Sequence, residues 1–164
     1  MTAVRRKPLI GVIGAGDATP AGRDCAFRVG QLLAEQGAVL VCGGLGGIME
    51  AAARGCAEAG GEVIGILPGD SPATANPYVS LPIVTDMGHA RNVIIAQTAR
   101  ALIAIEGSYG TLSEMAVGLK LQKPVIQLLA QTELPGTVLV QTPEEAVVLA
   151  LMAAREGETD VRIC

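Results

Sequence analysis

Short apolar runs recur along the chain, and most are followed by a glycine-rich or polar turn and then by a segment with helical spacing of its apolar residues. In the first such segment Ala26, Val29 and Leu33 recur every three or four positions. Apolar runs without polar alternation predict strands buried on both faces, which is typical of a parallel sheet. The sequence therefore predicts an α/β fold, a single-domain Rossmann-like doubly wound parallel sheet with helices on both faces and right-handed crossovers. The predicted strands are Pro8–Ile13, Val39–Cys42, Val63–Leu67, Leu81–Val84, Ala101–Ile105, Val125–Leu128 and Thr137–Val140.

Chain length predicts a single domain, since 164 residues, half of them apolar, are enough for one buried core. We expect the ligand-binding domain over residues 1–154 and a polar C-terminal tail over residues 155–164. The last helix has a strong start signal, because Thr142 is a capping residue, Pro143 suits the first helical position and a capping-box glutamate follows. The first predicted helix begins at Pro20, and the other predicted helices cover Ile48–Ala59, His89–Thr98, Leu112–Leu121 and Glu144–Ala154.

Composition and charge argue against several classes of partner. A net charge of −4 and three aromatic residues provide neither the basic surface nor the stacking platforms of a nucleic-acid-binding protein. The apolar stretch Ala146–Ala154 is far shorter than the roughly 20 residues of a membrane span, and the one following Arg5, Arg6 and Lys7 is too short for a signal peptide. The four cysteines form no C-x-x-C pair and His89 has no neighbouring cysteine, so no metal or disulfide is expected. We expect a cytoplasmic protein.

The nine residues Glu106–Glu114, EGSYGTLSE, connect a predicted strand to a predicted helix. Gly107 and Gly110 permit a close approach of the backbone, and the helix start leaves unpaired N–H groups with a partial positive charge. Such a turn is suited to binding an anion, most often a phosphate. The candidate ligand contacts here are Gly107, Ser108, Tyr109, Gly110 and Thr111.

A second turn of this kind follows the strand Val39–Cys42, and its candidate ligand contacts are Gly43, Gly44, Gly46 and Gly47. Four glycines in five residues are a costly way to make a turn, which favours phosphate contact. Glu50 then either stays solvated near the helix terminus or contacts the ligand. Two phosphate-binding turns suggest one phosphate-bearing ligand.

The first turn of the chain contains Gly14 and Gly16 and begins like a dinucleotide fingerprint. It lacks the third glycine, and no acidic residue follows the second strand, so NAD is not expected. Gly14 and Gly16 either face a ligand or simply let the strand turn sharply.

Glu114, Arg91 and Asn92 are the candidate polar side chains that accompany these turns. Glu114 fits a capping box with Thr111, and the alternative is a carboxylate that binds a ribose hydroxyl or activates water at a glycosidic carbon. Arg91 and Asn92 either supply a cation and an amide to the ligand or form a solvated first helical turn. His89 is expected at the surface.

Three motifs resemble the LOG-like superfamily, once labelled lysine decarboxylase-like, over nearly all of Leu9–Leu128. They are GGLGGIMEAAARG, DMGHARN and EGSYGTLSE. LOG nucleotide phosphoribohydrolases carry PGGxGTxxE and an arginine from the preceding helix, and the matching residues here are Gly107, Gly110, Thr111, Glu114 and Arg91.

Three departures from the LOG pattern stand within these motifs. Glu106 replaces the proline, Ser108 replaces the second glycine, and Asn92 stands where a lysine commonly follows the arginine. The form GSYGTLSEMAVGLKLQKPV looks more like the branch that contains molybdenum cofactor carrier proteins. That resemblance implies that the same glycine turns bind a phosphorylated pterin, usually in a homodimer or homotetramer.

We therefore expect a binding or carrier protein for a phosphate-bearing small molecule, with the molybdenum cofactor as the best candidate. The alternative is a nucleoside 5′-monophosphate phosphoribohydrolase in which Glu114 is the catalytic carboxylate and Arg91 steadies the substrate. A third hypothesis is a nucleotide-sensing module that assembles through the apolar helices Val93–Ala96 and Met115–Leu121. Recognition of the ligand's ring system is expected to depend on the loop Asp70–Val79 and on neighbouring subunits.

Overall fold

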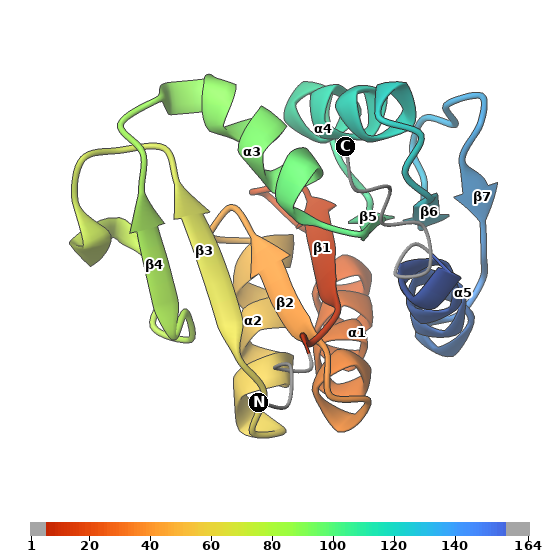
Figure 1. The fold of residues 1–164 in the computed structure, drawn as a ribbon, viewed down its shortest axis with the longest axis horizontal. Coiled ribbons are helices and arrows are strands. Elements are labelled where there is room, and N and C mark those ends of the chain that lie inside the picture. Colours follow the sequence, from red (N-terminus) through yellow and green to blue (C-terminus); the bar gives the residue numbers. More distant parts are fainter. Residues whose placement is uncertain (1–5, 157–164) are drawn as a thin grey trace, which may run out of the picture.

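The computed structural model describes residues 6–156, and within them seven parallel strands form one sheet (Figure 1). The strand order is β4-β3-β2-β1-β5-β6-β7, and each neighbouring pair is parallel. The predicted doubly wound parallel sheet is confirmed. The strands are β1 (Leu9–Gly14), β2 (Val39–Cys42), β3 (Val63–Leu67), β4 (Leu81–Val84), β5 (Ala101–Ile105), β6 (Val125–Leu128) and β7 (Val138–Leu139).

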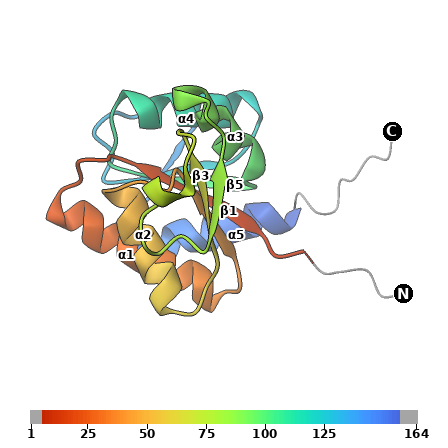
Figure 2. The same ribbon diagram turned by 90° about the vertical axis from the view of Figure 1, so that its left-hand side faces the viewer.

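Helices cover both faces of the sheet, and Figure 2 shows the two layers from the side. One layer contains α1, α2 and α5, and the other contains α3 and α4. The α-helices are α1 (Pro20–Glu35), α2 (Ile48–Glu58), α3 (Arg91–Thr98), α4 (Tyr109–Lys120) and α5 (Pro143–Glu156), and two short 3₁₀ helices are η1 (Pro72–Thr74) and η2 (Gly88–Ala90).

The central strands are buried on both sides, which explains their continuous apolar sequences. In β5 every residue is buried. Ile103 and Ile105 pack into the core beneath α1, α2 and α5, whereas Leu102 and Ala104 pack into the core beneath α3 and α4. Each face of the sheet therefore has its own apolar core.

The strand order reverses direction between β1 and β5. Strands β2, β3 and β4 continue the sheet on one side of β1, and β5, β6 and β7 continue it on the other. The helices that follow these two neighbouring strands, α1 and α4, consequently lie on opposite faces. In doubly wound sheets such a switch point opens the ligand-binding crevice at the carboxyl ends of the strands.

Two glycines in helix interiors allow α1 and α2 to pack closely. A Cβ on Gly30 would collide with the carbonyl oxygen of Ala52, and one on Gly55 would collide with the carbonyl oxygen of Phe27. Neither position has a positive φ, so glycine is required there by the distance between the helices. This packing fixes the positions of the amino ends of both helices beside the switch point.

The predicted helix starts at Pro20 and Pro143 are confirmed. Thr19 Oγ1 accepts a hydrogen bond of 3.0 Å from the Gly22 amide at the start of α1. At α5 the Thr142 hydroxyl accepts from the Glu145 amide, and the Glu145 carboxylate accepts from the Thr142 amide, both at 3.2 Å. This reciprocal pair is the predicted capping box.

Other predicted bounds differ from the structure. Helix α4 begins at Tyr109, three residues before the predicted start, and α3 begins at Arg91 after the short helix η2. Helix α5 extends to Glu156, into the predicted tail, and the rest of that tail lies outside the described residues. Within residues 6–156 no helix combines the length and the apolar character needed to cross a membrane.

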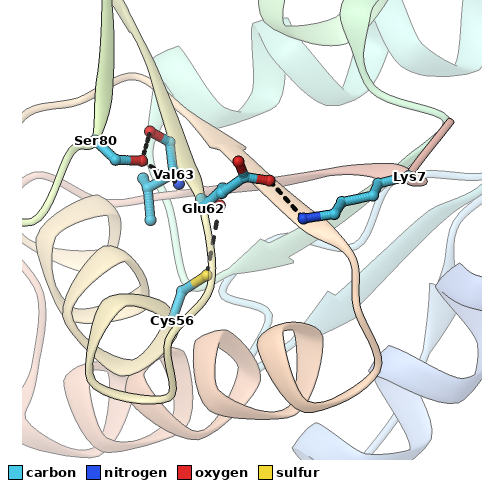
Figure 3. A network of polar contacts seen from close by, with 5 residues as sticks. All are labelled: Lys7, Cys56, Glu62, Val63 and Ser80. Atoms are coloured by element: carbon cyan, nitrogen blue, oxygen red, sulfur yellow. Dashed lines mark hydrogen bonds and ion pairs between the residues drawn. The ribbon is translucent and has the colours of Figure 1, made fainter. Parts of the chain in front are cut away.

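A polar network links the segments at the amino ends of β1, β3 and β4 (Figure 3). The Lys7 ammonium and the Glu62 carboxylate are 2.7 Å apart, and the Cys56 thiol donates to the Glu62 carbonyl at 3.6 Å. The Ser80 hydroxyl accepts from the Val63 amide at 2.8 Å and donates to its carbonyl at 3.0 Å. Burial raises the pKa of Cys56 to about 11, so this cysteine is a structural thiol at the edge opposite the switch point.

Candidate functional site

In chain order, the first glycine turn contains Gly14 and Gly16, the second contains Gly43 to Gly47, and the third contains Gly107 and Gly110. The first two contact each other at the carboxyl edge of the sheet. The Ile48 amide, at the start of α2, donates a hydrogen bond of 3.0 Å to the Ala15 carbonyl. A Cβ on Gly47 would collide with that same carbonyl, and a Cβ on Gly14 would collide with Ile48 and with the Ile105 carbonyl. Gly14 and Gly47 are therefore required by the contact between the loops.

Arg91, at the first position of α3, connects the second glycine turn to α4. Its guanidinium lies against Gly43, where a Cβ would be 2.8 Å from Nη2. The side chain is only 7% exposed, and its Nε has no hydrogen-bond partner among the described residues. Burial lowers the pKa of Arg91, and the nearby Glu114 carboxylate partly opposes that shift. An unpartnered buried guanidinium is unfavourable unless an anion completes its environment.

Glu114 is a second buried charge at the same place. It is 6% exposed, and burial raises its pKa to about 7, although Arg91 acts to lower it. The predicted capping box with Thr111 is wrong, because the N-cap of α4 is Ser108, so Thr111 and Glu114 both lie inside the helix. The sequence pattern T-x-x-E fitted a cap only under the assumption of a later helix start.

The helices that begin at the second and third glycine turns have uncapped amino ends. No side chain caps α2, whose N-cap is Gly47, or α4, whose N-cap is Ser108. By contrast, Thr19 caps α1 and Thr142 caps α5. Uncapped amide groups with the partial positive charge of a helix terminus are suited to an anion.

Three glycines in these turns are not required by the protein's own packing. A Cβ on Gly16 or Gly110 would meet no atom within 4 Å, and one on Gly46 would lie 3.9 Å from Glu50. None of the three has a positive φ. By contrast, Gly44 has a φ of 73° and Gly107 a φ of 121°, so these two are needed for the turns themselves.

Glu106, which sequence reasoning treated only as a departure from the LOG pattern, forms part of the site's framework. Its carboxylate accepts hydrogen bonds from the Thr19 amide, at 3.1 Å, and from the Thr19 hydroxyl. A Cβ on Gly22 would lie 2.5 Å from the Glu106 carboxyl carbon. The amino end of α1 is therefore occupied by the chain's own carboxylate, which leaves α2 and α4 for an external anion. The one sequence signal for this contact was Gly22, a glycine in the first turn of α1.

Asn92 contacts α4. Its Nδ2 donates to the Ser113 hydroxyl at 3.2 Å, and that hydroxyl donates to the Gly110 carbonyl at 2.6 Å. The two bonds connect the start of α3 to the first turn of α4. Ser113 was not among the predicted site residues.

The remaining predicted residues of the third turn differ in exposure. Ser108, Tyr109 and Gly110 are exposed, and the Tyr109 side chain is 89% exposed. Thr111 is buried against Gly107, where a Cβ would lie 2.6 Å from the Thr111 Cβ. Thr111 therefore supports the turn, while the first three residues are open to solvent.

The loop between β3 and β4 is attached to the second glycine turn through Asn76. This buried residue donates from its backbone amide to the Gly44 carbonyl at 2.8 Å and from its side-chain amide to the Leu45 carbonyl at 3.0 Å. The loop therefore lies beside the second glycine turn, at the carboxyl edge of the sheet. His89 is exposed in η2, as predicted.

The arrangement combines groups of positive charge with one titratable carboxylate. Arg91 and the amino ends of α2 and α4 provide positive charge, whereas burial raises the pKa of the Glu114 carboxyl to about 7. No three His, Cys, Asp or Glu side chains gather as in a metal site anywhere in residues 6–156.

Comparisons with known proteins support one family. A sequence profile of the SLOG cluster4 family matches residues 7–156. A relative described as an uncharacterized protein from Archaeoglobus fulgidus is 49% identical over 138 residues, which cover 84% of this chain and 91% of the relative. The cytokinin riboside 5′-monophosphate phosphoribohydrolase LOG from Oryza sativa is 35% identical over 97 residues, which are 57% of this chain and 40% of that enzyme.

Two solved structures are similar over almost their whole length. The molybdenum cofactor binding protein from Rippkaea orientalis has a TM-score of 0.86 and 38% identity, over 91% of this chain and 98% of that one. The molybdenum cofactor carrier protein from Chlamydomonas reinhardtii has a TM-score of 0.84 and 33% identity, over 92% of this chain and 99% of that one.

Proposed function

The chain belongs to the SLOG cluster4 family, and from this premise we propose that it is a binding or carrier protein for a phosphate-bearing small molecule, with the molybdenum cofactor as the ligand. The observation that carries this proposal is Arg91, a buried guanidinium whose Nε has no partner in residues 6–156. It lies against Gly43, in the turn that leads to the uncapped amino end of α2. A phosphate there would pair with the cation and accept hydrogen bonds from backbone amides.

The similarity to the two molybdenum cofactor proteins supports the choice of ligand. It extends over nine-tenths of this chain and nearly all of each protein. The match to the LOG enzyme covers 40% of that enzyme. The bound group would supply the metal and pterin chemistry, and this chain would supply Arg91 and the glycine turns that bind its phosphate.

Gly110→Asp tests the phosphate site. An aspartate in the first turn of a helix is compatible with the helix dipole, and the new Cβ meets no neighbouring atom, so the fold should be unchanged. The added negative charge should lower the affinity for a phosphate-bearing ligand more than tenfold in equilibrium binding, a difference of more than about 1.4 kcal/mol.

The matched control is Ala116→Asp, which adds the same charge at an exposed position of the same helix, away from its amino end. It should leave binding unchanged. Equal affinities of the wild type and Gly110→Asp, or no binding of the molybdenum cofactor and of a panel of nucleoside monophosphates, would reject the proposal.

A second candidate is a nucleoside 5′-monophosphate phosphoribohydrolase. The observation in its favour is the Glu114 carboxyl, whose pKa of about 7 is suited to acid–base catalysis near neutral pH. Incubation with a panel of nucleoside 5′-monophosphates should then release free base, and Glu114→Gln should abolish the release. No free base from any nucleotide of the panel removes this candidate.

We also propose that the chain forms a homodimer or homotetramer. The helices named in the assembly hypothesis bury much of their apolar surface within the chain, including Ile95, Ala96 and Met115. A more accessible apolar surface lies on β7 and α5, and its exposed side chains are Val138, Leu139, Val148, Leu149 and Met152. Contiguous exposed apolar side chains are typical of an association surface.

A further inference from the structure

A pocket separate from Arg91 opens between α1, α2 and the β3–β4 loop, with a volume of about 470 Å³. Its wall includes Gly47, the last residue of the second glycine turn. Gly43, which contacts Arg91, is four residues away in the same turn, a span of at most about 14 Å. The pocket therefore opens within the reach of one small molecule from the proposed phosphate site.

Aromatic side chains concentrate in this pocket. The whole chain has one phenylalanine, two tyrosines and no tryptophan, and Phe27 and Tyr78 both line the pocket. The guanidinium of Arg54 lies 5.6 Å from the centre of the Phe27 ring. Aromatic rings and stacked guanidinium groups provide flat surfaces for a planar heterocycle.

The charged side chains of the pocket favour a ligand that donates hydrogen bonds. Arg54 is paired with Glu58 at 2.7 Å, and Arg23 Nε donates to the Ala18 carbonyl at 3.2 Å. Asp24 and Glu50, like Arg23, form no ion pair within residues 6–156, so both carboxylates are available as acceptors. The acceptors among the charged side chains are carboxylates, which suit the N–H donors of a ligand.

We infer that this pocket binds the ring of the phosphorylated ligand, a flat heterocycle whose 2-amino-4-oxopyrimidine edge donates hydrogen bonds to Asp24 and Glu50 and whose face stacks on Phe27 or Tyr78. Pterins and guanine both present this edge. The inference rests on the proposed function, because the phosphate of the same molecule occupies the site at Arg91 and Gly110.

Binding of analogues that differ only at the 2-amino group tests the inference. GMP is compared with IMP, and a pterin phosphomonoester with its lumazine counterpart, by calorimetry on the full chain. We expect the 2-amino compound of each pair to bind about tenfold more tightly, since a charge-assisted hydrogen bond is lost in the other. Glu50→Gln and Asp24→Asn should remove this preference, and Glu35→Gln, an exposed carboxylate of α1 outside the pocket, should keep it.

Each result has a defined meaning. A preference that disappears in Glu50→Gln or Asp24→Asn supports the inference, and the tighter of GMP and the pterin identifies the ring. Equal binding within both pairs, or a preference that survives in both variants or is lost instead in Tyr109→Ala, overturns the inference. If binding then still depends on Gly110, the phosphate site stands without the ring pocket. Failure of all four compounds to bind overturns the inference, whereas the proposed function is rejected only if the molybdenum cofactor also fails to bind.

Discussion

Glu114 and Arg91 are two opposite charges that the fold buries at one place without joining them in an ion pair. Their mutual attraction offsets only part of the cost of burial, because the pKa of Glu114 is raised and that of Arg91 is lowered. Such a site is less stable when empty than when an anion completes it. Binding of an anion at this site should therefore raise the free energy of unfolding of the protein.

Glu114→Gln should remove a pH dependence of stability. Because the pKa of Glu114 is about 7 in the folded protein and 4.5 in the reference state, its contribution is fully present below pH 4.5 and is lost as the pH rises through 7. The loss amounts to about 3 kcal/mol. Urea unfolding of the ligand-free protein at several pH values should show this decline in the wild type and a flatter profile in the variant. Parallel profiles would contradict the assignment.

Glu106→Gln should destabilise the fold. The substitution keeps the shape of the side chain but removes the negative charge that accepts from the Thr19 amide and hydroxyl at the amino end of α1. We expect the free energy of unfolding to fall by about 1–2 kcal/mol. Chemical denaturation measures it, and Glu35→Gln at the exposed carboxyl end of the same helix should change stability much less. An unchanged midpoint in Glu106→Gln would show that α1 does not depend on this carboxylate.

At the scale of elements, the helices differ in how their amino ends are satisfied. Thr19 and Glu106 accept hydrogen bonds from backbone amides at the start of α1, and Thr142 does so at the start of α5. Helices α2 and α4 have no side-chain cap. The close packing of α1 on α2 fixes one of the uncapped ends, and Asn92 and Ser113 connect the other to α3. These two helix starts are thus positioned by rigid elements, as a preorganised anion site would require.

Gly30→Ala and Gly110→Ala should distinguish a glycine that close helix packing requires from a glycine that faces open space. In a helix interior the change to alanine normally stabilises by up to about 1 kcal/mol. At Gly30 the new Cβ would collide with the Ala52 carbonyl, so we expect a loss of about 1–3 kcal/mol from α1–α2 overpacking. Gly110→Ala, with open space in front of it, should be neutral or slightly stabilising. Thermal unfolding of both variants checks the contrast, and the same sign of change in both would contradict it.

At the scale of the whole molecule, the proposed phosphate site and the proposed association surface lie on different elements. The site uses the turns that precede α2 and α4, whereas the exposed apolar side chains lie on β7 and α5. Assembly through β7 and α5 would therefore use none of the residues of the proposed phosphate site.

Met152→Glu should dissociate the oligomer. Met152 is 54% exposed in α5, so a glutamate at this position leaves the core unchanged. It places a charge in the proposed association surface. Sedimentation should show a dimer or tetramer for the wild type and a smaller species for the variant, with unchanged affinity for phosphate ligands. Leu81→Glu, on the exposed edge strand β4, is the control. A monomeric wild type would reject the proposed assembly.

The sequence by itself determined the class of fold, the strands and the location of the three glycine turns. Unbroken apolar runs such as Ala101–Ile105 indicate strands buried on both faces, and local signals such as Thr142-Pro143 indicate helix starts. These features depend on neighbours in the chain, so the pattern was sufficient to predict them. The start of α4 was missed by three residues because T-x-x-E resembles a cap.

Only the tertiary structure decided which of these groups share an environment. Three long-range contacts show this. Arg91 contacts Gly43, Glu106 accepts a hydrogen bond from Thr19 across 87 residues of chain, and Phe27 and Tyr78 line one pocket. A pKa near 7 for Glu114 likewise reflects burial by distant segments. Charge and burial depend on distance in space, and distance in space is set by how the helices pack on the sheet.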